Sequence, residues 1–128
     1  MDIVVNYALH LVAAGLLLIV FFLVYSWATP FDEITLVRQG NVAAALTLGG
    51  ALIGFSMTVA SGLIHTGSLR SFVAWSAAAA AVQLLTYVLV THLLHMSKQQ
   101  IETNNVAFGV LLASISISVG AVSAGALS

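Results

Sequence analysis

The stretch that decides the fold is Thr29–Gly54, which reads TPFDEITLVRQGNVAAALTLGGALIG. It holds the only proline and three of the chain's seven charged residues, counting three basic and four acidic side chains. Proline directly after threonine is typical of a helix start, with Asp32 and Glu33 in the first turn, where the helix dipole favours anions. We therefore expect a short interfacial segment, residues 31–39, that continues into an apolar helix from Asn41 to about Ile64.

The rest of the chain has the composition of a membrane protein. Hydrophobic residues make up 61% of the 128 positions and charged residues 5%, whereas soluble domains carry about 25% charge. A span takes roughly 20 apolar residues, and open strands cannot face lipid. We therefore expect an all-α integral membrane protein with four transmembrane helices. Besides the helix above, these are about Val4–Ala28, Phe72–Leu94 and Ser97–Ala126.

The N-terminus reads as a retained helix. Asp2 is acidic where a signal peptide is basic, and the apolar run that follows is about 20 residues long, beyond the length of a signal core. Tyr25 and Trp27 lie at its far end, where amphipathic aromatic side chains prefer the water interface.

Composition also excludes several classes of function. The net charge of −1 leaves no basic patch for nucleic acid, and the absence of cysteine removes disulfides and thiolate sites. No nucleophile triad, phosphate-binding glycine loop or catalytic carboxylate pair is present. We expect neither an enzyme nor a cofactor.

The two halves of the chain match at an offset of 64 residues, where Asn41-Val42-Ala43 recurs as Asn105-Val106-Ala107. This match predicts a single membrane domain, 1–128, built by tandem duplication of a two-helix unit, residues 1–64 and 65–128. Units with an even number of helices insert the same way, so we expect parallel repeats about an axis along the membrane normal.

Orientation follows from the few basic residues. Arg38 and Lys98 lie on one side of the expected bundle and Arg70 on the other. The positive-inside rule then favours a bacterial inner membrane protein with residues 29–40 and 95–104 in the cytoplasm and both termini in the periplasm.

Polar residues at or inside the spans are the candidate functional residues. Asn41 and Asn105 stand at equivalent helix starts, where they either form a polar constriction for a pathway or fix packing by hydrogen bonds. Glu33 is a further candidate for the mouth of a pathway. His10 and Gln83 lie within apolar spans, where polar side chains usually face the bundle interior or an aqueous cavity.

The remaining candidates are surface charges, packing residues and one histidine pair. The interfacial charges are Asp32, Arg38, Lys98 and Glu102. Small residues suited to close helix packing are Ala45, Gly49, Gly50, Gly54, Ser114 and Ser118. His92 and His95 share a helix face, but two ligands without a nearby cysteine or carboxylate do not complete a metal site.

The segment PFDEITLVRQGNVAAALTLGGALIGF, with its start Gly40-Asn41-Val42-Ala43-Ala44-Ala45, resembles the small bacterial inner-membrane proteins of the YjfL-like family, domain of unknown function 350. The second copy departs from this motif, since Asn104 replaces the glycine. The resemblance covers essentially the whole chain. It implies four spans, an inner-membrane location and an association with envelope or stress operons.

Two functions remain open from the sequence. The first is an oligomeric conduit for protons or small cations, with Asn41, Asn105 and Glu33 at its mouth. The second is a membrane scaffold that docks a cytoplasmic, envelope-stress partner through residues 31–40 and 97–104. We expect a homo-oligomer, a dimer or higher, in the lipid bilayer under both. Metal handling by the histidine pair is a third possibility.

Overall fold

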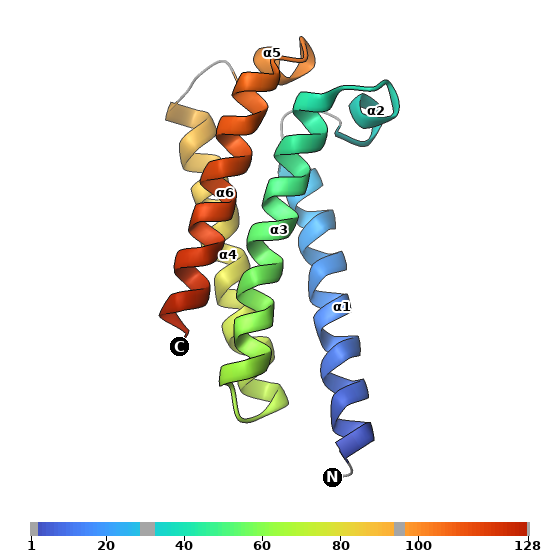
Figure 1. The fold of residues 1–128 in the computed structure, drawn as a ribbon, viewed down its shortest axis with the longest axis vertical. Helices are drawn as coiled ribbons and strands as arrows, with labels where there is room; N and C mark the ends of the chain where they lie inside the picture. Colours follow the sequence, from blue (N-terminus) through green and yellow to red (C-terminus); the bar gives the residue numbers. More distant parts are fainter. Residues whose placement is uncertain (1–2, 29–32, 94–96, 128) are drawn as a thin grey trace.

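The computed structural model describes residues 3–28, 33–93 and 97–127 of the chain. Its helices are α1 (Ile3–Ala28), α2 (Glu33–Arg38), α3 (Val42–His65), α4 (Leu69–Leu93), α5 (Ser97–Glu102) and α6 (Val106–Ala126). The long helices α1, α3, α4 and α6 form a bundle, and the short helices α2 and α5 lie together at one of its ends (Figure 1). Each long helix is apolar and long enough to cross a membrane, which agrees with the four expected spans.

The largest difference from the expected boundaries is a break before α3 and before α6. We expected the interfacial segment to continue into the second span and expected one helix over Ser97–Ala126, and both expectations are wrong. Gly40 has φ +83° and Asn104 has φ +60°, in the left-handed region that ends a right-handed helix. The polar turns α2 and α5 therefore stand as separate helices, and the spans start after a turn.

Both spans start with the same local geometry. The Asn41 N–H donates to the Leu36 carbonyl at 2.9 Å, and the Asn105 N–H donates to the Gln100 carbonyl at 2.9 Å. Each asparagine is the N-cap of its helix, with its side-chain oxygen accepting from the N–H three residues on. This capping satisfies an N–H that the helix itself leaves unpaired.

The α4 helix begins three residues before the expected Phe72. The Ser68 hydroxyl accepts a hydrogen bond from the Ser71 N–H at 3.2 Å, which is the bond that a serine N-cap makes. The connection between α3 and α4 is correspondingly shorter than expected.

The tightest contact in the bundle joins α3 and α6, which run in the same direction (Figure 1). A Cβ built on Gly50 would lie 2.5 Å from the Ala113 Cα, and one built on Gly109 would lie 2.8 Å from the Ala43 Cα. A Cβ on Gly120 would overlap the Gly54 backbone. The two backbones therefore touch, as small residues permit in membrane helices.

Side chains from α3 and α4 also hydrogen-bond to carbonyl groups along one stripe of α6. Gln83 Nε2 donates to the Ser116 carbonyl at 2.9 Å, and Thr58 Oγ1 donates to the Gly120 carbonyl at 3.1 Å. Ser61 Oγ donates to the Ala124 carbonyl at 2.7 Å. These acceptors are four residues apart, so they lie on one helix face, and the bonds hold α6 against its neighbours.

The other small residues expected at helix contacts lie elsewhere. Ala45, Ser114 and Ser118 are exposed on the outside of the bundle, and nothing lies within 4 Å of a Cβ built on Gly49. Only the spacing from Gly50 to Gly54 lies in a helix contact within this chain. The Ser114 hydroxyl instead bonds back to the Val110 carbonyl of its own helix at 2.7 Å.

A second core joins α1, α3 and α4 and is rich in aromatic side chains. Its buried members are Ala14, Phe21, Tyr25, Ala51, Phe55, Val59, Phe72 and Tyr87. The Phe21 and Phe55 rings stack with centroids 4.4 Å apart. This core positions the functional residues described next.

Candidate functional site

The most unusual side chain in the structure is Glu33, the first residue of α2. It is only 2% exposed, although glutamate is almost never fully buried. It lies close enough to Tyr25 and Tyr87 to interact electrostatically with their hydroxyls. A carboxyl group thus lies beside two phenols at the end of an apolar bundle.

The two tyrosines of this site pack against each other and are buried. Their rings meet edge to face with centroids 4.9 Å apart, and their exposures are 1% for Tyr25 and 5% for Tyr87. Among the residues that the structure describes, no group forms a hydrogen bond with the Tyr25 hydroxyl. A buried phenol usually has a partner, so this hydroxyl retains the capacity to bond a ligand or a water molecule.

Three helices bring these side chains to one place. Tyr25 is in the last turn of α1, Glu33 begins α2, and Tyr87 lies near the end of α4. At this end of α1 Tyr25 is buried in the bundle, whereas Trp27 is 86% exposed. We name the group Glu33, Tyr25 and Tyr87 the carboxyl–tyrosine cluster.

The carboxyl–tyrosine cluster has the chemistry of a proton or cation site. Burying an ionised carboxylate costs free energy unless the group is protonated, paired with a cation or hydrogen-bonded. Phenol hydroxyls can both donate and accept hydrogen bonds. The cluster can therefore hold a proton, or oxygen ligands for a small cation, away from bulk water.

The asparagines that we selected from the repeat act as caps. Asn41 is 8% exposed; its Oδ1 accepts from the Ala44 N–H at 2.8 Å, and its Nδ2 donates to the Ile101 carbonyl at 2.7 Å. Asn105 is exposed, accepts from the Phe108 N–H at 3.2 Å and donates to Gln100 Oε1 at 2.6 Å. These bonds favour packing over a pathway.

Asn104, which the sequence analysis noted only as a motif departure, adds a cross-link between the halves. Its Oδ1 accepts from the Ala43 N–H at 3.0 Å. Together with the bond from Asn41 to Ile101, this ties the start of α3 to α5 and the turn that follows it. An asparagine in the left-handed region before a helix is the sequence signal for this role.

The two polar residues within spans occupy different environments. Gln83 is 5% exposed and faces the bundle interior, where it bonds to α6, as expected for a polar group in a span. His10 is half-buried, and its Nδ1 lies 2.8 Å from the Asn6 carbonyl. A carbonyl only accepts hydrogen bonds, so Nδ1 donates here and Nε2 is left for another partner.

His10 lines a crevice of about 440 Å³ at the end of the bundle opposite the carboxyl–tyrosine cluster. The crevice lies between the first turns of α1 and the connection from α3 to α4. Its lining residues are Ile3, Asn6, Tyr7, His10, Leu11, Leu63, Thr66, Gly67, Ser68 and Leu69. Half of this lining is able to hydrogen-bond, so the crevice can hold water.

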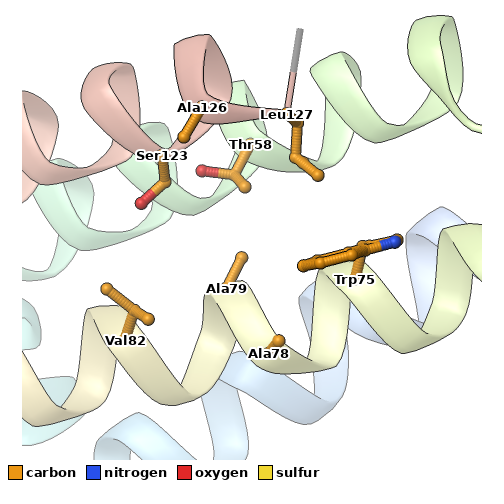
Figure 2. Close-up of a pocket in the computed structure, with 8 residues that line it drawn as sticks. All are labelled: Thr58, Trp75, Ala78, Ala79, Val82, Ser123, Ala126 and Leu127. Atoms are coloured by element: carbon orange, nitrogen blue, oxygen red, sulfur yellow. The ribbon is translucent and has the colours of Figure 1, made fainter.

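A separate pocket of about 160 Å³ opens between α3, α4 and α6 (Figure 2). Across it, α4 contributes Trp75, Ala78, Ala79 and Val82, and the end of α6 contributes Ser123, Ala126 and the C-cap residue Leu127. Thr58 of α3 also lines the pocket. No titratable side chain lines this pocket. The pocket is mostly apolar and is of the kind that a lipid chain or a packed side chain fills.

The interfacial charges lie on the surface at the end formed by α2 and α5. Arg38, Lys98 and Glu102 are exposed, while Asp32 lies outside the described residues. His92 is exposed and His95 also lies outside the described residues, so the pair is not tested. Within residues 3–28, 33–93 and 97–127, no three His, Asp or Glu side chains are grouped around a possible metal ion.

Comparisons with known proteins agree with this architecture. The model of the family described as "Domain of Unknown Function (DUF350)" matches residues 1–127. The chain is 29% identical over 104 residues to the UPF0719 inner membrane protein YjfL of Escherichia coli K12, covering 81% of this chain and 79% of that protein. It is 28% identical over 118 residues to the UPF0719 transmembrane protein YshE of Bacillus subtilis 168, covering 91% and 87%. No solved structure matches.

Proposed function

This chain belongs to the DUF350 family of membrane proteins, and on that premise we propose that it binds a proton or small cation at Glu33 as part of a conduit in the inner membrane. The single observation that carries the proposal is the burial of Glu33 beside Tyr25 and Tyr87. Ionisable groups within membrane bundles are costly, and they commonly mark proton relays and ion pathways.

We propose a place for the conduit that differs from the one suggested by the sequence. Along the contact of α3 with α6, the space is too small even for a methyl group at Gly50, Gly109 or Gly120. A path between these two helices would need them to separate. The carboxyl–tyrosine cluster lies instead on the side of α3 that faces α1 and α4, and we assign the conduit to that side.

We further propose that the chain arose by tandem duplication and works as a homo-oligomer. The duplication is supported by the matching asparagine caps and by contacts between α3 and α6 at positions close to 64 apart, such as Ser61 with Ala124. Oligomerisation is supported by the exposed small residues Ala45, Ser114 and Ser118 on the outer faces of these helices.

A second proposed function is a scaffold that docks a cytoplasmic partner. Neither proposed function includes an enzymatic activity. One observation favours the scaffold: α2 and α5 lie at the same end of the bundle (Figure 1), and between them they carry exposed charged and apolar side chains. These side chains are Ile34, Val37, Arg38, Lys98 and Glu102. Under this function Arg38→Glu or Lys98→Glu releases the partner, and the termini lie on the periplasmic side.

Ion flux into liposomes tests the leading proposal. Purified wild type is compared with Glu33→Gln, which keeps the shape of the side chain but removes its charge, and with Glu102→Gln, a matched change at an exposed position. We expect proton or monovalent-cation flux from the wild type and from Glu102→Gln, and none above empty liposomes from Glu33→Gln. Equal flux from all three proteins, or from none, refutes the proposal.

The asparagine hypothesis is tested in the same assay. Because Asn41 and Asn105 act as caps here, we expect the double variant Asn41→Leu, Asn105→Leu to have a less stable fold. We expect the flux per folded protein to stay the same. Loss of flux from a folded double variant would support a role for both asparagines in the pathway.

A further inference from the structure

We propose that the conduit runs through the aromatic core of α1, α3 and α4, opens at the far end in the crevice beside His10, and is closed by the stacked rings of Phe21 and Phe55. This inference rests on the proposed function of Glu33 and extends it to a route and a gate. The argument proceeds from the crevice inward to the carboxyl–tyrosine cluster.

The crevice provides the opening opposite Glu33. While His10 Nδ1 bonds to the Asn6 carbonyl, the other ring nitrogen, Nε2, is left to hydrogen-bond with water in the crevice. The His10 ring lies against Phe72, with centroids 5.9 Å apart. Phe72 in turn is fully buried in the core, so the crevice reaches the core directly.

Next to Phe72 lies a hydroxyl with unused hydrogen-bonding capacity. Ser76 is 0% exposed, and within the described part of the chain its Oγ makes no hydrogen bond. Serine in a helix commonly bonds back to its own backbone, as Ser114 does here. Ser76 Oγ and the Phe72 ring both adjoin Gly62, which places this hydroxyl on the crevice side of the core.

The Tyr25 hydroxyl is the counterpart of the Ser76 hydroxyl, on the side of the core away from the crevice. It too is buried without a hydrogen bond among the described residues, and it lies in the carboxyl–tyrosine cluster. Buried polar groups in native proteins are nearly always bonded. Two such hydroxyls, one toward each polar end of the same core, are expected if water enters that core transiently and bonds to both.

Between them lies an apolar constriction. Ser76 and Tyr87 are 11 residues apart on α4, or about 16 Å along the helix axis, too far for a proton to pass without water. Phe21 and Phe55, at 2% and 1% exposure, belong to the same core as Phe72 and Tyr87, and we assign the constriction to their stacked rings. Hydrophobic constrictions in channels gate by excluding water, and the small members of this core, Ala14 and Ala51, cannot replace a lost ring.

Flux through a ring-deletion variant tests the gate. Phe21→Ala removes one stacked ring, while Phe22→Ala removes a ring of the same size from the next position, which is outside the core cluster. We expect Phe21→Ala to raise proton flux roughly tenfold over the wild type, which corresponds to about 1.4 kcal/mol off the barrier. We expect Phe22→Ala to leave it unchanged, and Glu33→Gln to abolish the increase in Phe21→Ala.

The outcomes separate the route from the proposed function. Glu33-dependent flux that is the same in wild type, Phe21→Ala and Phe22→Ala overturns the route and leaves the function standing. A tenfold increase that persists with Glu33→Gln supports the route and overturns the role of Glu33. No flux from any of these variants overturns both.

Thiol labelling tests the route without changing the aromatic core, in case Phe21→Ala does not fold. The chain contains no cysteine, so Ser76→Cys introduces a single thiol at almost unchanged volume. Ala77→Cys, one residue further and exposed on the outside of the bundle, is the control in lipid at the same depth. Reaction of a small water-soluble thiol reagent with Ser76→Cys, faster than with Ala77→Cys, supports a wetted route, since the thiolate needs water to form. Equal or slower reaction overturns it.

Discussion

Replacing Gly50 with alanine tests whether backbone contact between α3 and α6 holds the bundle together. The new methyl group would lie 2.5 Å from the Ala113 Cα and 2.7 Å from the Ala113 Cβ. Since carbon atoms pack best at about 3.5–4.0 Å, the two helices must separate locally by about 1 Å. Overpacking of this kind costs about 1–3 kcal/mol.

Two smaller effects modify this value. Separation of the helices stretches the hydrogen bonds from Gln83 to Ser116 and from Thr58 to Gly120, now 2.9 and 3.1 Å, and such bonds contribute about 0.6 kcal/mol each in membranes. Alanine in place of a helical glycine returns about 0.5–1 kcal/mol through backbone entropy. We therefore expect the free energy of unfolding to fall by about 1–3 kcal/mol.

The adjacent glycine is the matched control. Nothing lies within 4 Å of a Cβ on Gly49, so Gly49→Ala changes only the helix propensity, and we expect unchanged stability or a gain of up to about 1 kcal/mol. Unfolding in mixed detergent micelles, followed by tryptophan fluorescence, measures both variants. If Gly50→Ala and Gly49→Ala unfold within about 0.5 kcal/mol of each other, the contact between α3 and α6 does not carry the stability assigned to it.

Two further stability predictions use the same assay. Asn41→Ala removes a cap together with a buried bond to the α5 backbone, so we expect it to lower the free energy of unfolding by about 1–2 kcal/mol. Asn105→Ala, at an exposed cap, should lower it by about 0.5–1 kcal/mol. The reverse order would contradict the bond to α5. Thr58→Val keeps the side-chain shape and removes the bond to α6, for an expected loss of about 0.6–1.7 kcal/mol. Thr86→Val removes only a bond to its own helix and should be neutral, so equal effects at the two threonines would argue against the bonds along α6.

The spans were predictable because hydropathy and length are local properties. The N-terminal helix was expected from Val4 to Ala28 and is found from Ile3 to Ala28. Gln83 was expected to face the bundle interior or an aqueous cavity; it is 5% exposed and bonds to α6, because an amide has no hydrogen-bond partner in lipid.

The breaks at Gly40 and Asn104 were missed although their signals are in the sequence. Glycine or asparagine directly before an asparagine cap indicates a left-handed turn followed by a new helix. The polar residues of α2 and α5 were instead assigned to the first turns of the spans that follow. That assignment was wrong because it used the polarity of these residues and not the backbone conformation expected at Gly40 and Asn104.

Length and apolar composition by themselves determined a four-span membrane protein, because each helix satisfies its own backbone and needs no neighbour to cross lipid. Only the tertiary structure decided which faces lie inside. Membrane helices are apolar nearly all round, so no amphipathic period marks the buried side, and Gly49 and Gly50 look alike until α6 is placed. For the same reason the burial of Glu33 near Tyr25 and Tyr87 appeared only when three separate helix ends met.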